Sequence, residues 1–302
     1  MALHSIYPDN RYYDYAYKWG DGFKWGMRRD DTTTRNADNY CCGQTYVDLY
    51  RLTPEPQMLT KTKACMNMLV NTPQVDDWTW IDAIQMGMPL LAKMSALTGD
   101  QRYNEKAWQM YEWSRNTLAG GLFNEKEGLW WRDKDFVPPY KEPNGKNCYW
   151  SRGNGWVVAA LAKVLQELPE DAPHRDVYIK DLKAMLDAAV KCQREDGFWN
   201  VSLHDDSNFG GKETTGTALF VYGMAWGINN GILDRDKYLP SLTKGWNAIM
   251  NEAIHPNGYI GYVQGTGKEP KDGQPVKYDS KPDFDDYGTG CVLLAGSEVY
   301  KL

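Results

Sequence analysis

The 302-residue sequence contains no long apolar run, few histidines and no paired cysteines. No segment approaches the ~18 consecutive apolar residues of a membrane-spanning helix, so we expect no membrane partner. The four histidines lack HxxxH and HExxH spacing, and the six cysteines are scattered without a CxxC pair. We therefore expect no metal, no cofactor and no disulfide framework, and we interpret the cysteines as small core residues or free thiols.

Basic residues do not outnumber acidic residues in this sequence. The formal net charge is −6 and no Lys/Arg run occurs, so nucleic acid, which binds to a basic face, is not an expected partner. No Walker loop or GxSxG elbow is present, and Gly153-Asn154-Gly155 follows no strand, which excludes a dinucleotide-binding loop. Residues 1–10 show no signal-peptide pattern. Because an export signal would lie before the present start, the expected location is the cytoplasm or the periplasm. The oligomeric state stays open.

Aromatic residues that carry a polar group are abundant, with 13 Trp and 20 Tyr against 7 Phe. Such rings suit surfaces that are half apolar and half wet. Because sugar rings have apolar C–H faces and hydroxyl edges, this balance favours a carbohydrate cleft. A Trp-rich core explains any single ring equally well.

The apolar periodicity predicts helix after helix and almost no strand. Ile179, Leu182 and Leu186 recur at helical spacing, which predicts an amphipathic outer helix with Lys180, Asp181, Lys183 and Asp187 on its other face. By contrast, 218–228 and 81–97 are apolar on nearly all sides, as buried inner helices are. We expect ten helices, at about 10–26, 39–53, 55–71, 79–98, 101–118, 153–168, 175–194, 214–230, 236–254 and 286–300.

Three connectors in this pattern are similar to one another. Each contains a glycine (Gly128, Gly197 or Gly258) after an outer helix, and each precedes an inner helix whose start also contains glycine. Outer and inner helices that alternate in repeated hairpins are typical of an α/α toroid. The N-terminal ends of the inner helices would gather at one mouth, where their partial positive charge suits an anionic ligand.

Two aspartates begin predicted apolar helices. Asp82 follows Trp80, and aromatic neighbours should desolvate its carboxyl group and raise its pKa toward that of a general acid. Asp38 begins a helix one hairpin earlier, and two carboxylates facing each other suit acid/base sugar chemistry. Capping of a helix explains Asp38 as well, and capping or a favourable interaction with the helix dipole explains Asp76, Asp77 or Asp82.

The segment 150–156, Trp-Ser-Arg-Gly-Asn-Gly-Trp, is the most specific pattern in the chain. Trp150 and Trp156 bracket the guanidinium of Arg152, and the glycines beside Asn154 let backbone and ligand approach closely. This combination indicates a site that holds a planar carboxylate and stacks a sugar ring.

Several segments together resemble the unsaturated uronyl hydrolases of glycoside hydrolase families 88 and 105, and above all the unsaturated rhamnogalacturonyl hydrolases. These segments are Trp80-Ile81-Asp82, the pattern at 150–156, Gly43-Gln44-Thr45-Tyr46-Val47-Asp48-Leu49-Tyr50 and Glu213-Thr214-Thr215-Gly216-Thr217. The resemblance covers nearly the whole chain and implies an all-α fold, an (α/α)6 barrel of six hairpins, as a single catalytic domain over residues 1–302. The implied reaction removes a 4,5-unsaturated galacturonyl or glucuronyl residue from the non-reducing end of lyase-generated oligosaccharides, such as those of pectin, by hydration of the C4=C5 double bond.

The resemblance also implies roles for single residues. Asp82 matches the general acid/base of the family, and Asp38 matches a second carboxylate that contacts the ring hydroxyls. Substrate-binding positions correspond to Trp80, Trp150, Arg152, Asn154 and Trp156. A histidine is usual in the loop that here reads Gly128-Leu129-Trp130-Trp131-Arg132-Asp133, and Arg132 stands in its place. We therefore expect Arg132 to contact a more acidic substrate.

The resemblance leaves one structural and two functional alternatives. Ten predicted helices are two fewer than a six-hairpin barrel contains, so the sequence is expected either to begin after the first hairpin or to form an incomplete ring. A sugar epimerase or an ordinary inverting glycosidase would use a similar barrel, although scarce histidines weaken the epimerase. An inactive or truncated carbohydrate-binding protein is the third possibility.

Overall fold

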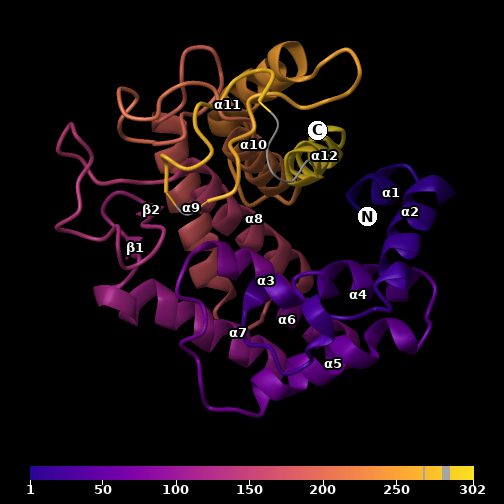
Figure 1. The fold of residues 1–302 in the computed structure, drawn as a ribbon. Coiled ribbons are helices and arrows are strands. Elements are labelled where there is room, and N and C mark those ends of the chain that lie inside the picture. Colours follow the sequence, from indigo (N-terminus) through magenta and orange to yellow (C-terminus); the bar gives the residue numbers. More distant parts are fainter. Residues whose placement is uncertain (268, 281–285) are drawn as a thin grey trace. The chain divides into compact units, whose positions relative to one another are not determined.

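A computed structural model describes residues 1–267, 269–280 and 286–302, and most of its regular structure is helical (Figure 1). The α-helices are α1 (Ala2–Ile6), α2 (Asn10–Gly22), α3 (Ala37–Tyr40), α4 (Gly43–Leu52), α5 (Gln57–Val70), α6 (Asp82–Thr98), α7 (Arg102–Glu112), α8 (Ser151–Glu167), α9 (Arg175–Lys191), α10 (Thr214–Asn229), α11 (Arg235–Ala248) and α12 (Asp286–Val299). Short 3-10 or π-helical turns are η1 (Arg28–Asp30), η2 (Trp113–Thr117), η3 (Leu118–Gly120) and η4 (Ile249–Ala253). Strands β1 (Phe123–Asn124) and β2 (Leu129–Trp130) pair antiparallel.

Each of the ten predicted helices has a counterpart, with three differences. The helix expected at 10–26 ends at Gly22, because Lys24 and Trp25 have positive φ angles of 53° and 54° that a right-handed helix does not allow. The helix expected at 39–53 is divided into α3 and α4. The short helix α1 and the β1–β2 hairpin were not predicted, because two-residue strands leave no alternation to detect.

The chain forms two compact parts, which are described separately. The first contains residues 1–121 and 163–175, and the second contains residues 122–162 and 176–302. That residues 1–302 act as one catalytic domain stays a prediction. All six cysteines are free thiols, as the sequence indicates.

In the first part, α6 and α7 pack together, as do α4 and α5. The inner helix α6 is buried along most of its length. Trp78 lies fully buried against it, and a Cβ at Gly87 would come within 2.7 Å of the Trp78 ring. Glycine at this position lets the indole lie on the helix backbone, and the packed ring fixes the chain just before Asp82.

In the second part, α10 packs against both α11 and α12 (Figure 1). Every residue from Thr214 to Gly227 is buried, as its apolar sequence predicts. Helix α9 is amphipathic as predicted, with Lys180 and Lys183 exposed. The expectation for Asp181 is wrong, because its side chain is fully buried.

The repeated glycines of the three connectors all have a left-handed backbone conformation. Gly128, Gly197 and Gly258 have φ angles of +69°, +94° and +85°, a region in which side chains with a Cβ are strained. A Cβ at Gly128 would also lie 2.6 Å from the carbonyl oxygen of Ala184, and one at Gly197 would lie 2.5 Å from that of Lys244. The similarity of the connectors in sequence therefore reflects the same positive φ angle, and at Gly128 and Gly197 also a turn packed against a following outer helix, whereas a Cβ at Gly258 would meet nothing within 4 Å.

The start of α10 is stabilised by a buried carboxylate. Glu213 accepts hydrogen bonds from the backbone N–H of Thr215 at 3.1 Å and of Gly216 at 2.6 Å. Replacing Glu213 by alanine leaves these donors buried without an acceptor, so we expect a loss of about 2–4 kcal/mol in the free energy of unfolding, measured by urea denaturation. Asp234→Ala is the matched control, because Asp234 caps α11 in the same way but is exposed. The Asp234→Ala variant should lose about 1 kcal/mol of unfolding free energy. Equal losses in the two variants would show that burial of the Glu213 carboxylate adds nothing to its capping effect.

Candidate functional site

Asp82 is the first residue of α6 and is half-buried. Trp80, also half-buried, precedes it, and the Trp80 carbonyl accepts a hydrogen bond from Ala83 N at 3.1 Å. The first turn is further held by Gln44 of α4, whose amide donates to the carbonyls of Gln85 at 2.9 Å and Met86 at 3.2 Å. Asp82 is not the N-cap, which is Ile81, so capping does not explain this aspartate, whereas its place in the first turn agrees with an interaction with the helix dipole.

The upstream aspartate Asp77 has a structural role. Arg35 donates to both of its carboxylate oxygens, with Nε–Oδ1 and Nη2–Oδ2 distances of 2.7 and 2.5 Å. Arg35 also donates to Thr72 Oγ1 at 2.9 Å. This bidentate ion pair ties the segment before α3 to the segment before α6.

Asp38 lies on the short helix α3, which packs against α6. The N-cap of α3 is Asn36, whose side chain accepts a hydrogen bond from Asp38 N at 2.9 Å. Asp38 is therefore not the capping residue, and its side chain is exposed. Tyr40 at the end of α3 accepts a hydrogen bond from the buried Trp78 Nε1 at 3.1 Å, so both helices that carry the predicted carboxylates are anchored to the same core of the first part.

In the second part, Trp150 is buried directly before α8. Its indole Nε1 donates to Gln264 Oε1 at 2.8 Å. The next residue, Ser151, donates its backbone N–H to the Val201 carbonyl at 2.9 Å. The predicted ring is therefore held between two loops that are distant in sequence.

Arg152 is also buried, with 4% of its surface exposed. Its guanidinium donates to the carbonyls of Gln264 at 2.6 Å and Gly265 at 2.9 Å. It also lies over the rings of Trp150 and Tyr287, with Cζ at 4.6 and 5.2 Å from the ring centroids. Arg152 thus binds the loop after Tyr262, in addition to any contact it makes with a ligand.

Asn154 has no exposed surface and binds the backbone of the β2 strand. Its Oδ1 accepts from Trp130 N at 2.8 Å, and its Nδ2 donates to the carbonyls of Trp130 and Trp150, both at 3.0 Å. This contact explains the pattern Gly153-Asn154-Gly155 structurally. A Cβ at Gly155 would lie 2.8 Å from Leu219 Cβ on α10, so this glycine serves helix packing.

The other two predicted binding residues are more accessible. Trp156 is half-buried on α8, and Arg132 is half-buried after β2. Arg132 Nη1 lies 2.6 Å from Asp133 Oδ2 in an ion pair. Asp38, Trp80 and Asp82 belong to the first part, whereas Arg132, Trp150, Arg152, Asn154 and Trp156 belong to the second.

Gln264 is a site residue that sequence reasoning missed. It is fully buried, and besides accepting from Trp150 its Nε2 donates to the carbonyls of Asp272 at 2.7 Å and Pro270 at 3.2 Å. Its backbone N–H lies 3.4 Å from Glu213 Oε1. One amide therefore joins Trp150 to the loop 264–272. No periodicity marks this glutamine, since it lies in a loop and its partner Trp150 is more than a hundred residues away.

In residues 1–267, 269–280 and 286–302, no three His, Cys, Asp or Glu side chains are grouped as metal ligands. Over the same ranges, no helix has the length and apolar character that crossing a bilayer requires.

Comparison with known proteins gives a match over the whole chain. The family model described as Glycosyl Hydrolase Family 88 matches residues 1–302. A protein of Formosa agariphila named unsaturated 3S-rhamnoglycuronyl hydrolase is 37% identical over 230 residues, which are 74% of this chain and 58% of that protein. The chain therefore spans less than two thirds of this relative's length.

Solved structures agree with the family match. A glycosyl hydrolase family 88 protein of Bacteroides vulgatus has 35% identity and a TM-score of 0.93, covering 100% of this chain and 89% of that one. A structure named as a polysaccharide lyase has 34% identity and a TM-score of 0.92, covering 99% and 86%. The predicted fold class, an all-α (α/α)6 barrel, is confirmed by these matches.

Proposed function

Because the chain belongs to glycosyl hydrolase family 88, we propose that it removes a 4,5-unsaturated uronic acid from the non-reducing end of lyase-generated oligosaccharides. The observation that carries this proposal is the family match over residues 1–302, and the name of the 37% identical relative supports it. The terminal residue is galacturonyl or glucuronyl, and the enzyme acts in the cytoplasm or periplasm, which fractionation of producing cells would distinguish.

Asp82 is the proposed general acid. Its carboxyl proton is transferred to C4 of the double bond while water adds its oxygen to C5. The resulting carboxylate takes up one of the two protons of that water, and the other stays on the new C5 hydroxyl. The C5 hemiketal then opens to a ketone, and the hemiacetal at C1 releases the aglycone alcohol and leaves an aldehyde. One water is consumed, and Asp82 returns to its protonated state. Asp38 on the adjacent helix α3 is proposed to bind ring hydroxyls.

Substrate binding is assigned to the aromatic and cationic residues at 150–156. Arg152 uses two N–H groups on the carbonyls of Gln264 and Gly265, and its other N–H groups are proposed to bind the uronate carboxylate. Trp80, Trp150 and Trp156 supply ring faces, and Arg132 supplies a second cation. Asn154 is proposed to affect substrate binding indirectly, by positioning the backbone of Trp130 and Trp150. Its side-chain amide donates hydrogen bonds to the carbonyls of both residues.

A pair of disaccharides tests the reaction. The two share one aglycone and differ only in the C4=C5 double bond of the uronyl residue. The proposal requires that the aglycone is released from the unsaturated member alone. Chromatography of the free sugar measures this release. Equal cleavage of both would indicate an ordinary glycosidase, and cleavage of neither would indicate an inactive binding protein.

The related structure named as a polysaccharide lyase supports a second candidate activity. A lyase acts on the intact polymer and creates double bonds, so absorbance in the far ultraviolet increases. The proposed hydration removes a double bond, so absorbance decreases. A sugar epimerase would change neither the absorbance nor the chain length of its substrate.

A further inference from the structure

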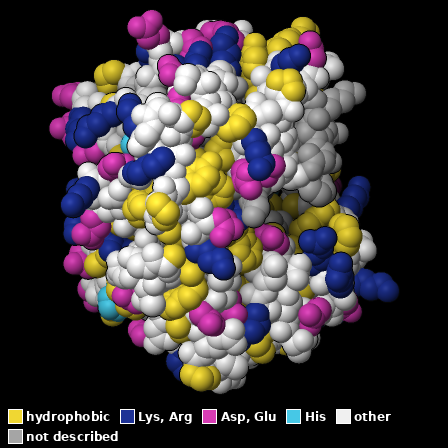
Figure 2. All heavy atoms as spheres, turned by 60° about the vertical axis from the view of Figure 1, so that its left-hand side comes forward, with side chains coloured by type: hydrophobic (Ala, Val, Ile, Leu, Met, Phe, Trp, Pro, Cys, Tyr) yellow, Lys and Arg dark blue, Asp and Glu magenta, His cyan; other side chains and the backbone are white. Residues whose placement is uncertain are grey.

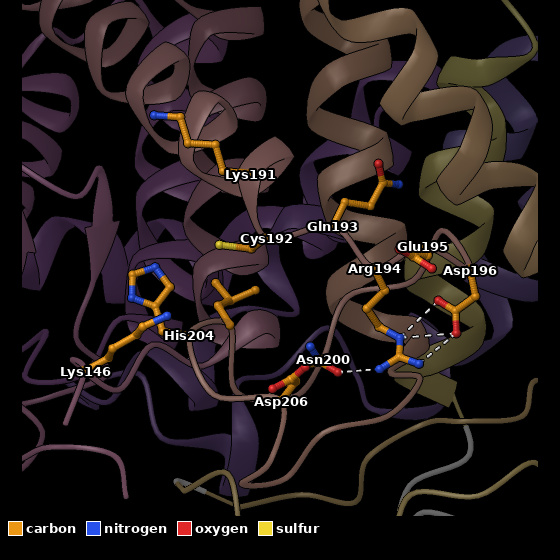
Figure 3. Close-up of a pocket in the computed structure, with 11 residues that line it drawn as sticks. Lys146, Lys191, Cys192, Gln193, Arg194, Glu195, Asp196, Asn200, His204 and Asp206 are labelled. Atoms are coloured by element: carbon orange, nitrogen blue, oxygen red, sulfur yellow. Dashed lines mark hydrogen bonds and ion pairs between the residues drawn. The ribbon is translucent and has the colours of Figure 1, made fainter. Parts of the chain in front are cut away.

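Two arginines in the second part of the chain differ in how their charge is balanced. Arg194 lines a pocket of about 790 Å³, and its guanidinium binds both carboxylate oxygens of Asp196 (Figure 3). Arg152 is buried, and no carboxylate pairs with it in the part of the chain that the structure describes. Because a buried cation without an anionic partner is costly, other groups must hold its guanidinium in place.

Exposed charges give a weak basis for selecting an anionic ligand. Figure 2 shows basic and acidic side chains interspersed on the visible face. The pocket of Arg194 is mixed in the same way, because Glu195, Asp196 and Asp206 line it together with its basic residues. Water and salt also screen exposed charges, whereas a buried charge is screened much less. The buried guanidinium of Arg152 is therefore the cation best suited to distinguish a charged sugar from a neutral one.

Tyr287, the second residue of α12, contacts the surroundings of Arg152 in two ways. Its ring lies beside the guanidinium, with 5.2 Å between Arg152 Cζ and the ring centroid. Its hydroxyl donates a hydrogen bond to the Gln264 carbonyl, and the same oxygen accepts from Arg152 Nη1 at 2.6 Å. The ring therefore attracts the cation directly, and the hydroxyl fixes one of the two carbonyls that bind it.

The packing of α12 places Tyr287 next to this loop. A Cβ at Gly288, the following residue, would lie 2.7 Å from Val263 Cγ2, so glycine allows the helix to approach closely. Val263 is buried and directly precedes Gln264. Helix α12 also packs against α10. Tyr287 is thus carried by a packed helix, and a helix holds a functional side chain more precisely than a loop does.

Arg152 keeps three donors for a ligand. A guanidinium has five N–H groups, and two of them bind the carbonyls of Gln264 at 2.6 Å and Gly265 at 2.9 Å, so three remain. Arginine binds a carboxylate best through two parallel N–H···O bonds, and a rotation of the guanidinium changes both distances. The groups that fix its orientation therefore set how strongly it binds a carboxylate.

We propose that Tyr287 is a positioning residue, which orients Arg152 so that the site binds a uronate carboxylate in preference to a neutral sugar. The ring and the hydroxyl of Tyr287 contribute separately, the first through the cation and the second through the Gln264 carbonyl. This inference rests on the proposed function, which assigns the uronate carboxylate to Arg152. It adds that selectivity for the charged group depends on a tyrosine that acts through the arginine.

Two disaccharides that differ in one group test this role: an unsaturated uronyl disaccharide and its uronamide, in which a neutral amide replaces the carboxylate. Isothermal titration calorimetry measures both dissociation constants on the whole chain carrying Asp82→Asn, which prevents turnover. The ratio of the two constants reports the preference for the charged group. In the chain with Asp82 intact, loss of the positioning contact should raise KM more than it lowers kcat, because the carboxylate is bound before and during the reaction.

Graded variants separate the two contributions of Tyr287. Tyr287→Phe removes the hydroxyl alone and should lower the preference by about 2–10-fold, the usual effect of one hydrogen bond. Tyr287→Leu also removes the ring and should lower it by ~10-fold or more. Tyr259→Phe is the matched control, because half-buried Tyr259 also donates its hydroxyl to a backbone carbonyl, that of Ser280. No contact joins Tyr259 to Arg152 among the described residues, so its loss should leave the preference unchanged.

An unchanged preference in Tyr287→Leu, or an equal fall in Tyr259→Phe, would overturn the positioning role. Equal affinity of the Asp82→Asn chain for acid and amide, or binding of neither, would overturn it as well. If Tyr287→Leu does not fold, Tyr287→Phe decides alone, because it keeps the ring. A preference that depends on Tyr287, without release of the aglycone by the chain with Asp82 intact, would overturn only the proposed function. The two proposals therefore fail separately.

Discussion

Replacement of Asp82 by asparagine is expected to lower kcat by about 10²–10⁴-fold, the usual contribution of a general acid or base. The amide has nearly the shape of the carboxyl group but cannot deliver a proton to C4. Because Asp82 is half-buried at the first turn of α6 and does not cap it, the substitution should leave the fold intact. Initial rates of aglycone release measure the loss, and circular dichroism at rising temperature verifies folding.

Asp76→Asn is the matched control for this experiment. Asp76 is exposed six residues upstream of Asp82, and the same change of charge there should alter kcat less than threefold if only the proton donor matters. Asp77 is unsuitable as a control, because its ion pair with Arg35 supports the local structure. Full activity in Asp82→Asn would show that another group protonates the substrate.

Replacement of Gln264 by leucine is expected to raise KM by ~10-fold or more and to change kcat less. The buried amide accepts from Trp150 Nε1 and donates to the carbonyls of Pro270 and Asp272. Leucine offers no hydrogen bond to the Trp150 indole or to the two carbonyls, and each buried group left without a partner costs about 1–3 kcal/mol. Trp150 and the loop that begins at Gln264 are then no longer held together. Since Arg152 binds the backbone of the same loop, the predicted carboxylate site would be displaced with it.

Gln193→Leu separates this positioning role from a general loss of stability. Gln193 is a bridging glutamine of the same part, whose Nε2 donates to the carbonyls of Gly197 at 2.9 Å and Ser241 at 3.0 Å. Both variants should lose thermal stability, but only Gln264→Leu should raise KM. A KM that rises equally in both variants, or in neither, would contradict the role assigned to Gln264.

The sequence predicts the helices of this protein well because each depends on local periodicity. The apolar run at 218–228 belongs to a buried inner helix, and the glycines at 128, 197 and 258 occupy the left-handed turns that follow outer helices. Asp181 shows where this reasoning fails. Its place on the helical wheel predicts exposure, but it is fully buried, and a single-helix pattern carries no information about what packs against the polar face.

The candidate site is less predictable than the fold, because its contacts join distant segments. The pattern at 150–156 shows that Arg152 and Asn154 are special, but not that both bind protein backbone. Gln264 lies in a loop without any helical or strand pattern, so only the folded chain reveals its contact with Trp150. Likewise, the sequence does not show whether Asp38 and Asp82 cap their helices. Only the structure shows that the N-caps are Asn36 and Ile81.

The most direct test of the proposed function is the far-ultraviolet absorbance of a lyase-generated unsaturated disaccharide incubated with the protein. Hydration of the C4=C5 bond predicts that absorbance falls as the aglycone is released, in a one-to-one ratio and without added metal or cofactor. Release of the aglycone with unchanged absorbance would contradict hydration, and constant absorbance without release on any such substrate would contradict the proposed activity itself.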